Sequence, residues 1–341
     1  MLGLLNSKCK LWILLNPTLL IVEERMKRAV ITGTAGFIGS RLTEKLLSKG
    51  ETIVGIDNFD PWYSPQTKEQ NLLTSLENEN FSLKKDDLLS VDLNSIFQEE
   101  DVVYHLAGRP GVQDSWGSGF SPSVENNILA TQRVFEAALS SGVKRVVFAS
   151  SSSVYGASAT SLSSEVNPIS PYGVTKAACE QLAQVYRFRG LDVMVMRYFT
   201  VYGPRQRPDM AMNRLFRAAL PGDYVFPLRG TGAQRREFTF VEDIVDATIR
   251  AGSLEIEAVT EPFDIGGGVS ASLSDVIDQV EQIVGSSIRV DHQPAAKGDP
   301  LITVADTEPA EKILGWRAST DLQTGLKKHF DSFMETSLPT S

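Results

Sequence analysis

The feature that most constrains the fold is a regular alternation of apolar and amphipathic segments between residues 28 and 203. The apolar segments have the length of buried strands: RAVITG, ETIVGIDNF, FSLKKDDL, DVVYHLAG, KRVVFASS and LDVMVMRYFTVYG. Helical patterns lie between them: FIGSRLTEKLLSKG, which we expect to end with Gly50 as its C-cap, VENNILATQRVFEAALSSG and PYGVTKAACEQLAQVYRFRG. This alternation predicts an α/β fold in which a doubly wound parallel sheet is covered by helices on both faces.

The sequence changes character after residue 203, where loops rich in proline and glycine separate further helical patterns. We expect residues 26–203 to form the large domain. Residues 204–335 are expected to form mainly a smaller, C-terminal substrate-binding lobe. Segments at about 238–252 and 263–268 should return to the large domain, so that the two parts are partly interleaved.

Residues 1–25 precede this pattern. Their apolar run from Leu11 to Val22 contains Asn16 and Pro17, and it is too short to span a bilayer as a helix. We interpret these residues as an extension, with Met26 as the more natural start of the fold. A weak membrane tether is the alternative, and no stable membrane insertion is expected.

Charge and composition exclude several classes of function. The chain has 341 residues, a formal net charge of −9 and a pI of about 5.0. An acidic chain without a basic run is poorly suited to nucleic acid, where neutralised phosphates dominate affinity. The cysteines, Cys9 and Cys179, are far apart, and His105, His292 and His329 share no spacing. We therefore expect neither a metal site nor a Ser-His-Asp triad.

A glycine-rich turn, GTAGFIG, joins the first predicted strand to the first predicted helix. Gly33 permits a tight turn, and Gly36 lets the backbone approach a pyrophosphate at the N-terminus of the helix. Gly39 allows close contact between helix and strand. Glycine triplets occur by chance, but this one lies between a strand and a helix and predicts a Rossmann-type dinucleotide site.

Carboxylates follow the next two strands. Asp57 ends the second strand, where an acid accepts hydrogen bonds from the hydroxyls of the adenosine ribose. A 2′-phosphate would meet its charge unfavourably, so the pattern favours NAD over NADP. Asp87 and Leu88 follow the third strand and could contact the adenine. A solvated acidic pair is the alternative there.

Tyr172 and Lys176 lie four residues apart and therefore share one face of a predicted helix. An adjacent ammonium stabilises a phenolate, which can then act as a general base. Such a pair is common by chance and could be an ordinary surface feature. Here the helix lies downstream of the strand that ends in Ser150–Ser153, so a serine hydroxyl could share a substrate oxygen with Tyr172.

Several motifs in register resemble the extended short-chain dehydrogenase/reductases that epimerise or dehydrate nucleotide sugars with NAD. The resemblance covers about residues 27–330 and rests on GTAGFIG, HLAG, FASSSSVYG, SPYGVTK, RYFTVYGPRQRPDMA, RREFTFVED and KGDP. It implies that Tyr172 takes the proton of a sugar hydroxyl while the carbon-bound hydrogen passes to NAD. Lys176 would bind the nicotinamide ribose, and Ser151 would be the catalytic hydroxyl.

The same resemblance implies a full set of cofactor contacts. They are Gly33, Gly36, Phe37, Ile38, Gly39, Asp57, Asn58, Asp87, Leu88, Leu106, Ala107, Asn127, Tyr172, Lys176 and Tyr198. Asn127 could equally be a polar residue on the side of a helix.

The run of serines distinguishes between reactions of the family. Dehydratases carry an acid pair, and decarboxylases a glutamate, where this chain has Ser152 and Ser153. A serine is a poor general acid or base near neutral pH, which favours epimerisation at C4 through a transient 4-keto sugar over elimination of water. With Thr200, these serines resemble UDP-glucuronic acid 4-epimerases, and we expect Ser151, Ser152, Ser153 and Thr200 to surround the sugar. One or two of the serines could simply fit a narrow strand end.

The nucleotide end of the substrate is predicted from three further residues. Arg236 matches a diphosphate-binding arginine, and a guanidinium fork suits phosphate oxygens. Arg207 could contact phosphate or the sugar acid, and Asp299 matches an acid that binds the uridine ribose. A departure from the family occurs at Gln113, where related sequences have an arginine. Arg109 or Arg207 could replace that cation.

Three functions stay open. The first is the 4-epimerisation of UDP-glucuronate to UDP-galacturonate. The second is the same reaction on UDP-glucose or UDP-N-acetylglucosamine, and the third is a non-catalytic NAD-binding sensor. The resemblance also implies a cytoplasmic homodimer formed through helices at about 125–141 and 171–189.

Overall fold

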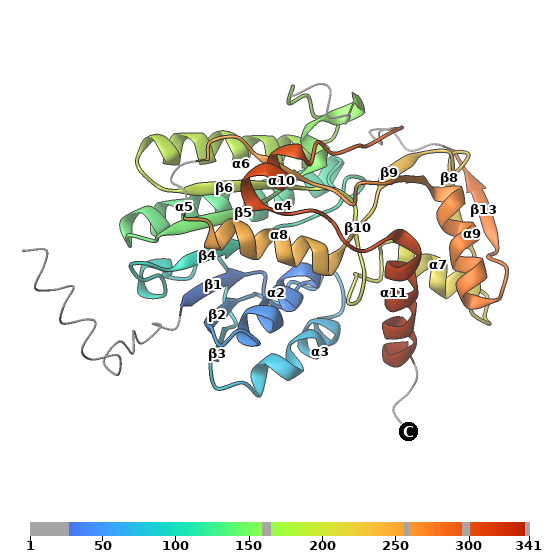
Figure 1. Ribbon diagram of the computed structural model, residues 1–341, viewed down its shortest axis with the longest axis horizontal. Coiled ribbons are helices and arrows are strands. Elements are labelled where there is room, and N and C mark those ends of the chain that lie inside the picture. The colour runs from blue at the N-terminus through green and yellow to red at the C-terminus, as the bar shows by residue number, and fades with distance from the viewer. Residues whose placement is uncertain (1–26, 159–164, 256–258, 295–300, 338–341) are drawn as a thin grey trace, which may run out of the picture.

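The computed structural model describes residues 27–158, 165–255, 259–294 and 301–337. Its main body is a seven-stranded parallel sheet (Figure 1). Across the sheet the strands are β3 (Phe81–Lys84), β2 (Thr52–Ile56), β1 (Arg28–Thr32), β4 (Val102–His105), β5 (Arg145–Ser151), β6 (Val193–Tyr198) and β11 (Phe263–Ile265). The order reverses direction at β1, as it does in dinucleotide-binding sheets, so the predicted doubly wound fold is confirmed.

Helices cover both faces of this sheet. One face packs against α2 (Phe37–Leu47) and α8 (Val241–Ser253), and the other against α5 (Ala130–Ser140) and α6 (Pro171–Phe188). The strands other than β3 are largely buried on both faces and therefore read as continuous apolar runs, whereas the edge strand β3 alternates between half-buried and exposed residues. Helix α3 (Pro65–Leu76) lies beside α2 and β3.

The smaller lobe lies beyond the end of the sheet, to the right in Figure 1. It contains α7 (Ala211–Ala219), β8 (Phe226–Arg229), β9 (Arg235–Glu237), β12 (Ser270–Ser272), α9 (Leu273–Val284), β13 (Val290–Gln293) and α11 (Leu322–Ser337). Short pairs β8–β13, β9–β12 and β7 (Val201–Tyr202)–β10 (Thr239–Phe240) link its segments. Helix α8 and strand β11 follow α7 in sequence but belong to the large domain. Strand β11 pairs with β6, and α8 packs on the sheet. Helix α10 (Glu308–Leu314) packs against β11 and α8.

Two helix boundaries differ from the sequence-based expectation. Helix α2 ends at Leu47 with Ser48 as its C-cap, and Gly50 takes a left-handed φ of 79° in the turn that follows. The predicted long helix begins with a π-helical segment, Val124–Leu129, before α5. A single π turn inside a helix often occurs at functional sites, and this one contains Asn127.

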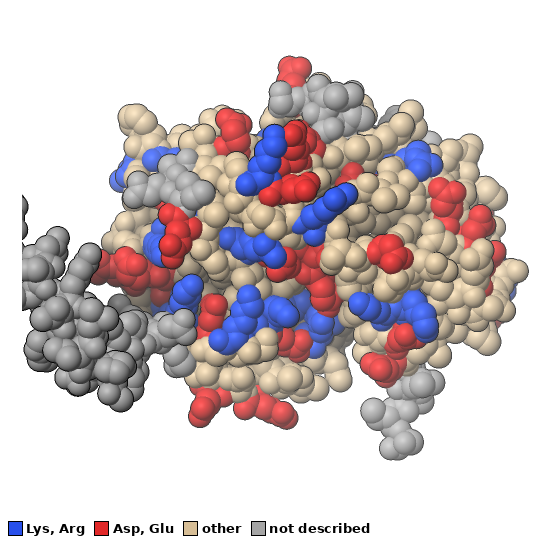
Figure 2. Space-filling view, viewed as in Figure 1, with Lys and Arg blue, Asp and Glu red and all other residues tan. Residues whose placement is uncertain are grey.

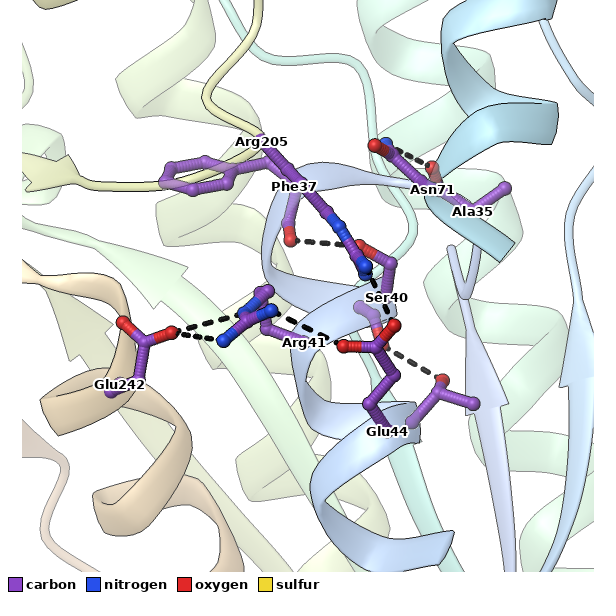
Figure 3. A network of polar contacts seen from close by, with 10 residues as sticks. Ala35, Phe37, Ser40, Arg41, Glu44, Asn71, Arg205 and Glu242 are labelled. Atoms are coloured by element: carbon purple, nitrogen blue, oxygen red, sulfur yellow. Dashed lines mark hydrogen bonds and ion pairs between the residues drawn. The ribbon is translucent and has the colours of Figure 1, made fainter. Parts of the chain in front are cut away.

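A polar network fixes α2, the helix that follows the glycine turn (Figure 3). Arg41 of α2 donates to Glu242 at the start of α8 and to Glu44, its neighbour on α2. Arg205, from the loop after β7, donates to the other oxygen of Glu44 at 2.6 Å. Figure 2 shows basic and acidic side chains intermixed on this face of the molecule.

Two sequence-based predictions fall outside the described residues: the interpretation of residues 1–25, and the role of Asp299. Within the residues that the structure describes, no helix is long and apolar enough to cross a bilayer.

Candidate active site

One cavity of about 460 Å³ opens at the carboxyl ends of the central strands. In open α/β sheets this edge, where the strand order reverses, is where ligands bind. Nearly all the residues that we predicted for cofactor and sugar line it: Gly33, Gly36, Phe37, Ile38, Gly39, Asp57, Asn58, Asp87, Leu88, Leu106, Ala107, Ser151, Ser152, Ser153, Tyr172, Lys176, Tyr198, Thr200 and Arg207. Positions spread over most of the large domain thus meet in one site.

The glycine turn has the geometry that its sequence predicts. Gly33 has a φ of 74°, and a Cβ there would lie 2.9 Å from the backbone of Ala107. A Cβ at Gly39 would lie only 2.0 Å from the carbonyl oxygen of Gly33, so helix and turn approach each other as closely as glycine allows. Gly36 is the N-cap of α2 and supplies no side-chain cap, which leaves the first amide groups of the helix for an anion.

Asp57 is buried, and its carboxylate is oriented by the backbone. One oxygen accepts from the amide of Ala35 at 3.0 Å, and the other from the amide of Phe59 at 2.8 Å. The ammonium of Lys68 lies 3.5 Å away. A carboxylate has about four acceptor positions, so these contacts hold the group and leave capacity for ribose hydroxyls. Nearby, the Asn58 amide donates to Asp87 at 2.9 Å.

Tyr172 and Lys176 project from the first turns of α6 into the cavity. Ser170 caps this helix by accepting from the amide of Gly173, and Pro171 is pre-organised for the first helical position. The amide of Tyr172 donates to the hydroxyl of Ser115 at 3.0 Å, and the Lys176 ammonium donates to the carbonyl of Ala149 at 2.9 Å. Backbone and side-chain contacts therefore fix both residues beside the end of β5.

Asn127 lies behind the cavity wall instead of on it. It is 1% exposed and accepts from the amide of Arg109 at 2.7 Å while donating to the carbonyl of Arg109 at 3.1 Å. Its amide also donates to the hydroxyl of Thr175 at 2.9 Å. Asn127 thus connects the loop after β4 to α6, and its neighbour Asn126 lines the cavity.

The four serines have different environments. Ser151 begins a single 3₁₀ turn, Ser152–Val154, and its hydroxyl accepts from the amide of Ser153 at 3.2 Å. Ser150 is buried and donates to the carboxylate of Glu180. Ser150 therefore anchors the end of the strand through Glu180. Ser151, Ser152 and Ser153 form the turn that follows and line the cavity.

A buried charge network lies behind the serines. Arg197, the neighbour of Ser150 across β5 and β6, binds both oxygens of Glu180, at 3.0 and 2.6 Å. It also donates to the hydroxyl of Tyr155, which donates to Asp264 at 2.7 Å. Burial raises the pKa of Asp264 to about 6. Glu180 is one further helical step from Tyr172 and Lys176, so one face of α6 contributes both the reactive pair and this anchor.

His105 occupies the buried wall beneath the site. Its ring nitrogens lie 2.7 Å from the hydroxyl of Thr32 and 3.0 Å from that of Thr131. Burial lowers its pKa to about 3. The ring is therefore neutral at ordinary pH.

Carboxylates are distributed unevenly in the cavity. Those that line it are Asp57, Asp60, Asp86 and Asp87, which all follow β2 or β3. The opposite end, after β5 and β6, is lined by serines, Tyr172, Tyr198 and Thr200. Among the described lining residues, no acid stands at the serine end.

The three predicted contacts to the substrate nucleotide are not all brought together. Arg207 lines the cavity and holds Asp209 through two bonds, of 3.0 and 2.9 Å. Arg236 lies on β9 and does not line this cavity. The segment that contains Asp299 lies outside the described residues, so the end of the site next to β9 is only partly defined.

Sequence reasoning missed the loop that follows β2 and the first turn of α3. Asp60, Trp62, Tyr63 and Lys68 all line the cavity. The signal that could have revealed them is two aromatic residues placed directly after the ribose-binding acid, in NFDPWYS. Within the described part of the chain, no group of histidine, cysteine, aspartate or glutamate side chains could hold a metal ion.

The cavity fits a dinucleotide. The turn leaves no space for a side chain at Gly33 or Gly39, and the N-terminus of α2 lacks a side-chain cap. Asp57 is held where the ribose would lie. When bound, NAD would supply a reversible hydride acceptor. Lys176 and Tyr172 would then stand at its nicotinamide end, and Asp57 at its adenosine end.

Comparison with known proteins also points to a family that uses NAD. The model of the NAD dependent epimerase/dehydratase family matches residues 29–266. A Bacillus subtilis protein described as an uncharacterized UDP-glucose epimerase, YtcB, is 39% identical over 303 residues, covering 88% of this chain and 95% of its own. The UDP-glucuronate 4-epimerase of Thermodesulfobacterium geofontis is 34% identical over 307 residues, covering 88% and 94%.

Among solved structures, that of UDP-glucuronic acid 4-epimerase from Bacillus cereus in complex with UDP-glucuronic acid and NAD superimposes with a TM-score of 0.87. Its sequence is 38% identical, and the match covers 91% of this chain and 99% of that one. The family match spans the glycine turn, the serines and the Tyr172–Lys176 pair. The chain belongs to the NAD dependent epimerase/dehydratase family.

Proposed function

We propose that this protein is an NAD-dependent UDP-sugar 4-epimerase that converts UDP-glucuronate to UDP-galacturonate. The observation that carries the proposal is the hydroxyl-lined, acid-free end of the cavity beside Tyr172 and Lys176. This end has a base and a proton-sharing serine for oxidising one sugar carbon. It has no acid, among the described lining residues, to move the resulting ketone toward elimination.

Each catalytic side chain has a separate task. The Tyr172 phenolate accepts the proton of the C4 hydroxyl. It returns the proton to the C4 oxygen after the 4-keto sugar has rotated in the site. Lys176, fixed on the carbonyl of Ala149, keeps positive charge beside that phenolate. Ser151 shares the sugar oxygen and holds it at hydrogen-bond distance from the base.

The acid sugar is favoured over a neutral one by the groups around C6. Ser152, Ser153 and Thr200 can donate hydrogen bonds to a carboxylate without a buried counter-charge, and hydrogen bonds to charged groups are each worth about 1.5–3 kcal/mol. The 4-keto acid is a β-keto acid and is prone to lose CO₂. We infer that firm placement of its carboxylate keeps the C–C bond out of the alignment that favours this loss.

Two observations keep a neutral sugar as the second candidate. Gln113 stands where related sequences have an arginine, and the B. subtilis relative is described as a UDP-glucose epimerase. Two reactions separate these candidates. The purified protein, without added cofactor, is incubated with UDP-glucuronate and separately with UDP-glucose, and the anomeric protons of the sugars are followed by NMR. Galacturonate formation supports the proposal, whereas galactose formation alone rejects it.

The finer assignments of the site are part of the same proposal. Arg207 is proposed to contact the sugar acid or phosphate, and Arg236 and Asp299 the nucleotide. Thr200→Ala tests the carboxylate site: kcat/KM for UDP-glucuronate should fall at least tenfold more than for UDP-glucose, because the lost hydrogen bond involves a charge only in the acid. Equal losses on both substrates would reject the carboxylate site.

We also propose a homodimer formed by α5 and α6, with residues 26–203 and 204–335 as the two functional parts. The two helices lie side by side, and exposed apolar side chains lie on α6 and at the end of the π-helical segment before α5: Val174, Val185 and Leu129. Val174 and Val185 are eleven residues apart, about three helical turns, and therefore lie on the same face of α6. A cytoplasmic location is proposed on the family resemblance alone.

A further inference from the structure

The loops after β2 and β4 meet over the dinucleotide end of the cavity. Trp62 lies on the loop after β2, and Arg109 on the loop after β4, and both line the cavity. The guanidinium of Arg109 lies 4.3 Å from the centre of the Trp62 ring. It also lies 4.0 Å from the carboxylate of Asp60, too far for a hydrogen bond.

The order of the strands shows what this contact crosses. β1 lies between β4 and β2 in the sheet, and the turn Gly33–Gly39 follows β1. A bridge between the loops after β4 and β2 must therefore pass the end of β1, where the glycine turn presents its amide groups. That turn is where a dinucleotide places its pyrophosphate.

Both sides of the bridge are held in place. Asn127 bonds the amide and the carbonyl of Arg109, which fixes the backbone from which the guanidinium extends. On the other loop, the amide of Trp62 donates to Asp60 at 2.8 Å, and the amide of Asp60 donates to Asn58 at 2.9 Å. These local bonds order the loop directly after Asp57.

The guanidinium of Arg109 retains its donors. Among the described residues it makes no hydrogen bond, and its side chain is 23% exposed. The Trp62 ring covers one side of the guanidinium, and the N–H groups that do not face the ring are left for a ligand. Such groups match phosphate oxygens in pairs.

We propose that Arg109 and Trp62 form a strap across the pyrophosphate of the bound dinucleotide and slow its release. This inference rests on the proposed function, because an epimerase has to keep one dinucleotide through the oxidation and the reduction of the same sugar. A dehydrogenase, in contrast, has to exchange its dinucleotide after each turnover. In this proposal Arg109 binds the cofactor, so its positive charge has a function that does not involve the sugar.

The test measures dinucleotide release directly. Wild-type protein and the variants Trp62→Ala, Arg109→Gln and Arg109→Lys are loaded with NAD, mixed with excess isotopically labelled NAD, and sampled by mass spectrometry of the bound dinucleotide. We expect exchange about tenfold faster or more in both Trp62→Ala and Arg109→Gln. The first variant removes the ring that holds the cation, and the second removes the cation itself. Arg109→Lys keeps a charge but loses the planar fork, and should lie between these variants and the wild type.

A matched control comes from the smaller lobe. Arg217 lies 5.3 Å from the ring centre of Tyr224, outside the cavity, so Arg217→Gln removes a similar pair and should leave exchange unchanged. Thermal melting confirms that each variant is folded, and Trp62→Leu, which has no aromatic face for the cation, replaces Trp62→Ala if the latter is not. The proposal is wrong if folded Trp62 and Arg109 variants release NAD at the wild-type rate. It is also wrong if NAD release is unchanged and only the KM for the sugar rises. Wild-type protein that binds no dinucleotide would contradict the proposed function itself.

Discussion

The two ends of the cavity use charge in opposite ways. At the proposed dinucleotide end, Asp57 and Asp87 line the cavity, and backbone amides orient Asp57. At the proposed sugar end, hydroxyl groups line the cavity, and the charges of Glu180 and Arg197 are buried behind Ser150. On the proposed function, the cofactor end would use fixed charges for recognition, whereas the lack of lining acids at the sugar end would limit what can follow oxidation.

The largest expected effect concerns the reactive base at the sugar end. Tyr172→Phe removes the phenolate, and general base catalysis contributes about 10²–10⁴-fold, so turnover should fall by at least that factor. UDP affinity should stay close to wild type, because Tyr172 is proposed to contact the sugar and not the nucleotide of the substrate. Tyr186→Phe, on the same helix but outside the cavity, is the control. Retained turnover in Tyr172→Phe, measured by NMR of the sugar product, would contradict the role of the phenolate.

The next effect tests the charges stored behind the serines. Glu180→Gln leaves the buried Arg197 without its carboxylate, which should cost about 3–5 kcal/mol of unfolding free energy. Glu136→Gln is the comparison, because Glu136 pairs with Arg189 and both side chains are half-exposed. Loss of this ion pair should lower the free energy of unfolding by less than about 1 kcal/mol. Urea unfolding of both variants measures the difference. Equal destabilisation would show that the buried network has no special role in holding the serine end.

A smaller effect is expected at the dinucleotide end. Asp57→Asn keeps an oxygen for one backbone amide but loses the charge that faces the ribose, so NAD affinity should fall about tenfold. The preference for NAD over NADP should narrow, because a 2′-phosphate no longer meets a carboxylate. Isothermal titration of both dinucleotides measures this. An unchanged preference would mean that Asp57 acts only as a turn-capping residue.

The smallest effect is a dependence on pH. Burial raises the pKa of Asp264 to about 6 from 3.8, so the folded protein binds this proton more tightly than the unfolded chain does. The contribution is fully present below pH 3.8 and is lost as the pH rises through about 6. Asp264→Asn removes this titration, so its stability relative to wild type should improve by about 1 kcal/mol between pH 5 and pH 7. Parallel stability curves over this range would contradict the assignment.

Features encoded locally could be predicted from the sequence. The glycine turn, Asp57 and the Tyr172–Lys176 pair each depend on a few adjacent residues in one element, and the structure places all of them at one cavity. Asn127 was assigned by its match to a family position, but its side chain points to the backbone of Arg109. A helical sequence does not reveal a π turn, which changes the direction of the side chains that follow it.

Contacts between distant loops could not be predicted. Trp62 and Arg109 are joined only because β2 and β4 lie on either side of β1, a consequence of strand order that neither segment carries alone. The buried network likewise depends on the register that places Ser150 beside Arg197 and Arg197 beside Asp264. The four serines looked alike in the sequence, and tertiary packing separates Ser150 from the others.

One measurement tests the central claim, that the sugar end oxidises and reduces C4 without acid–base chemistry at neighbouring carbons. Unlabelled UDP-glucuronate is converted in D₂O, and the product is examined by proton NMR. We expect UDP-galacturonate that retains its protons at both C4 and C5, with no pentose formed. Deuterium at C5, or a pentose product, would show that an acid or base reaches the ketone and would contradict the account.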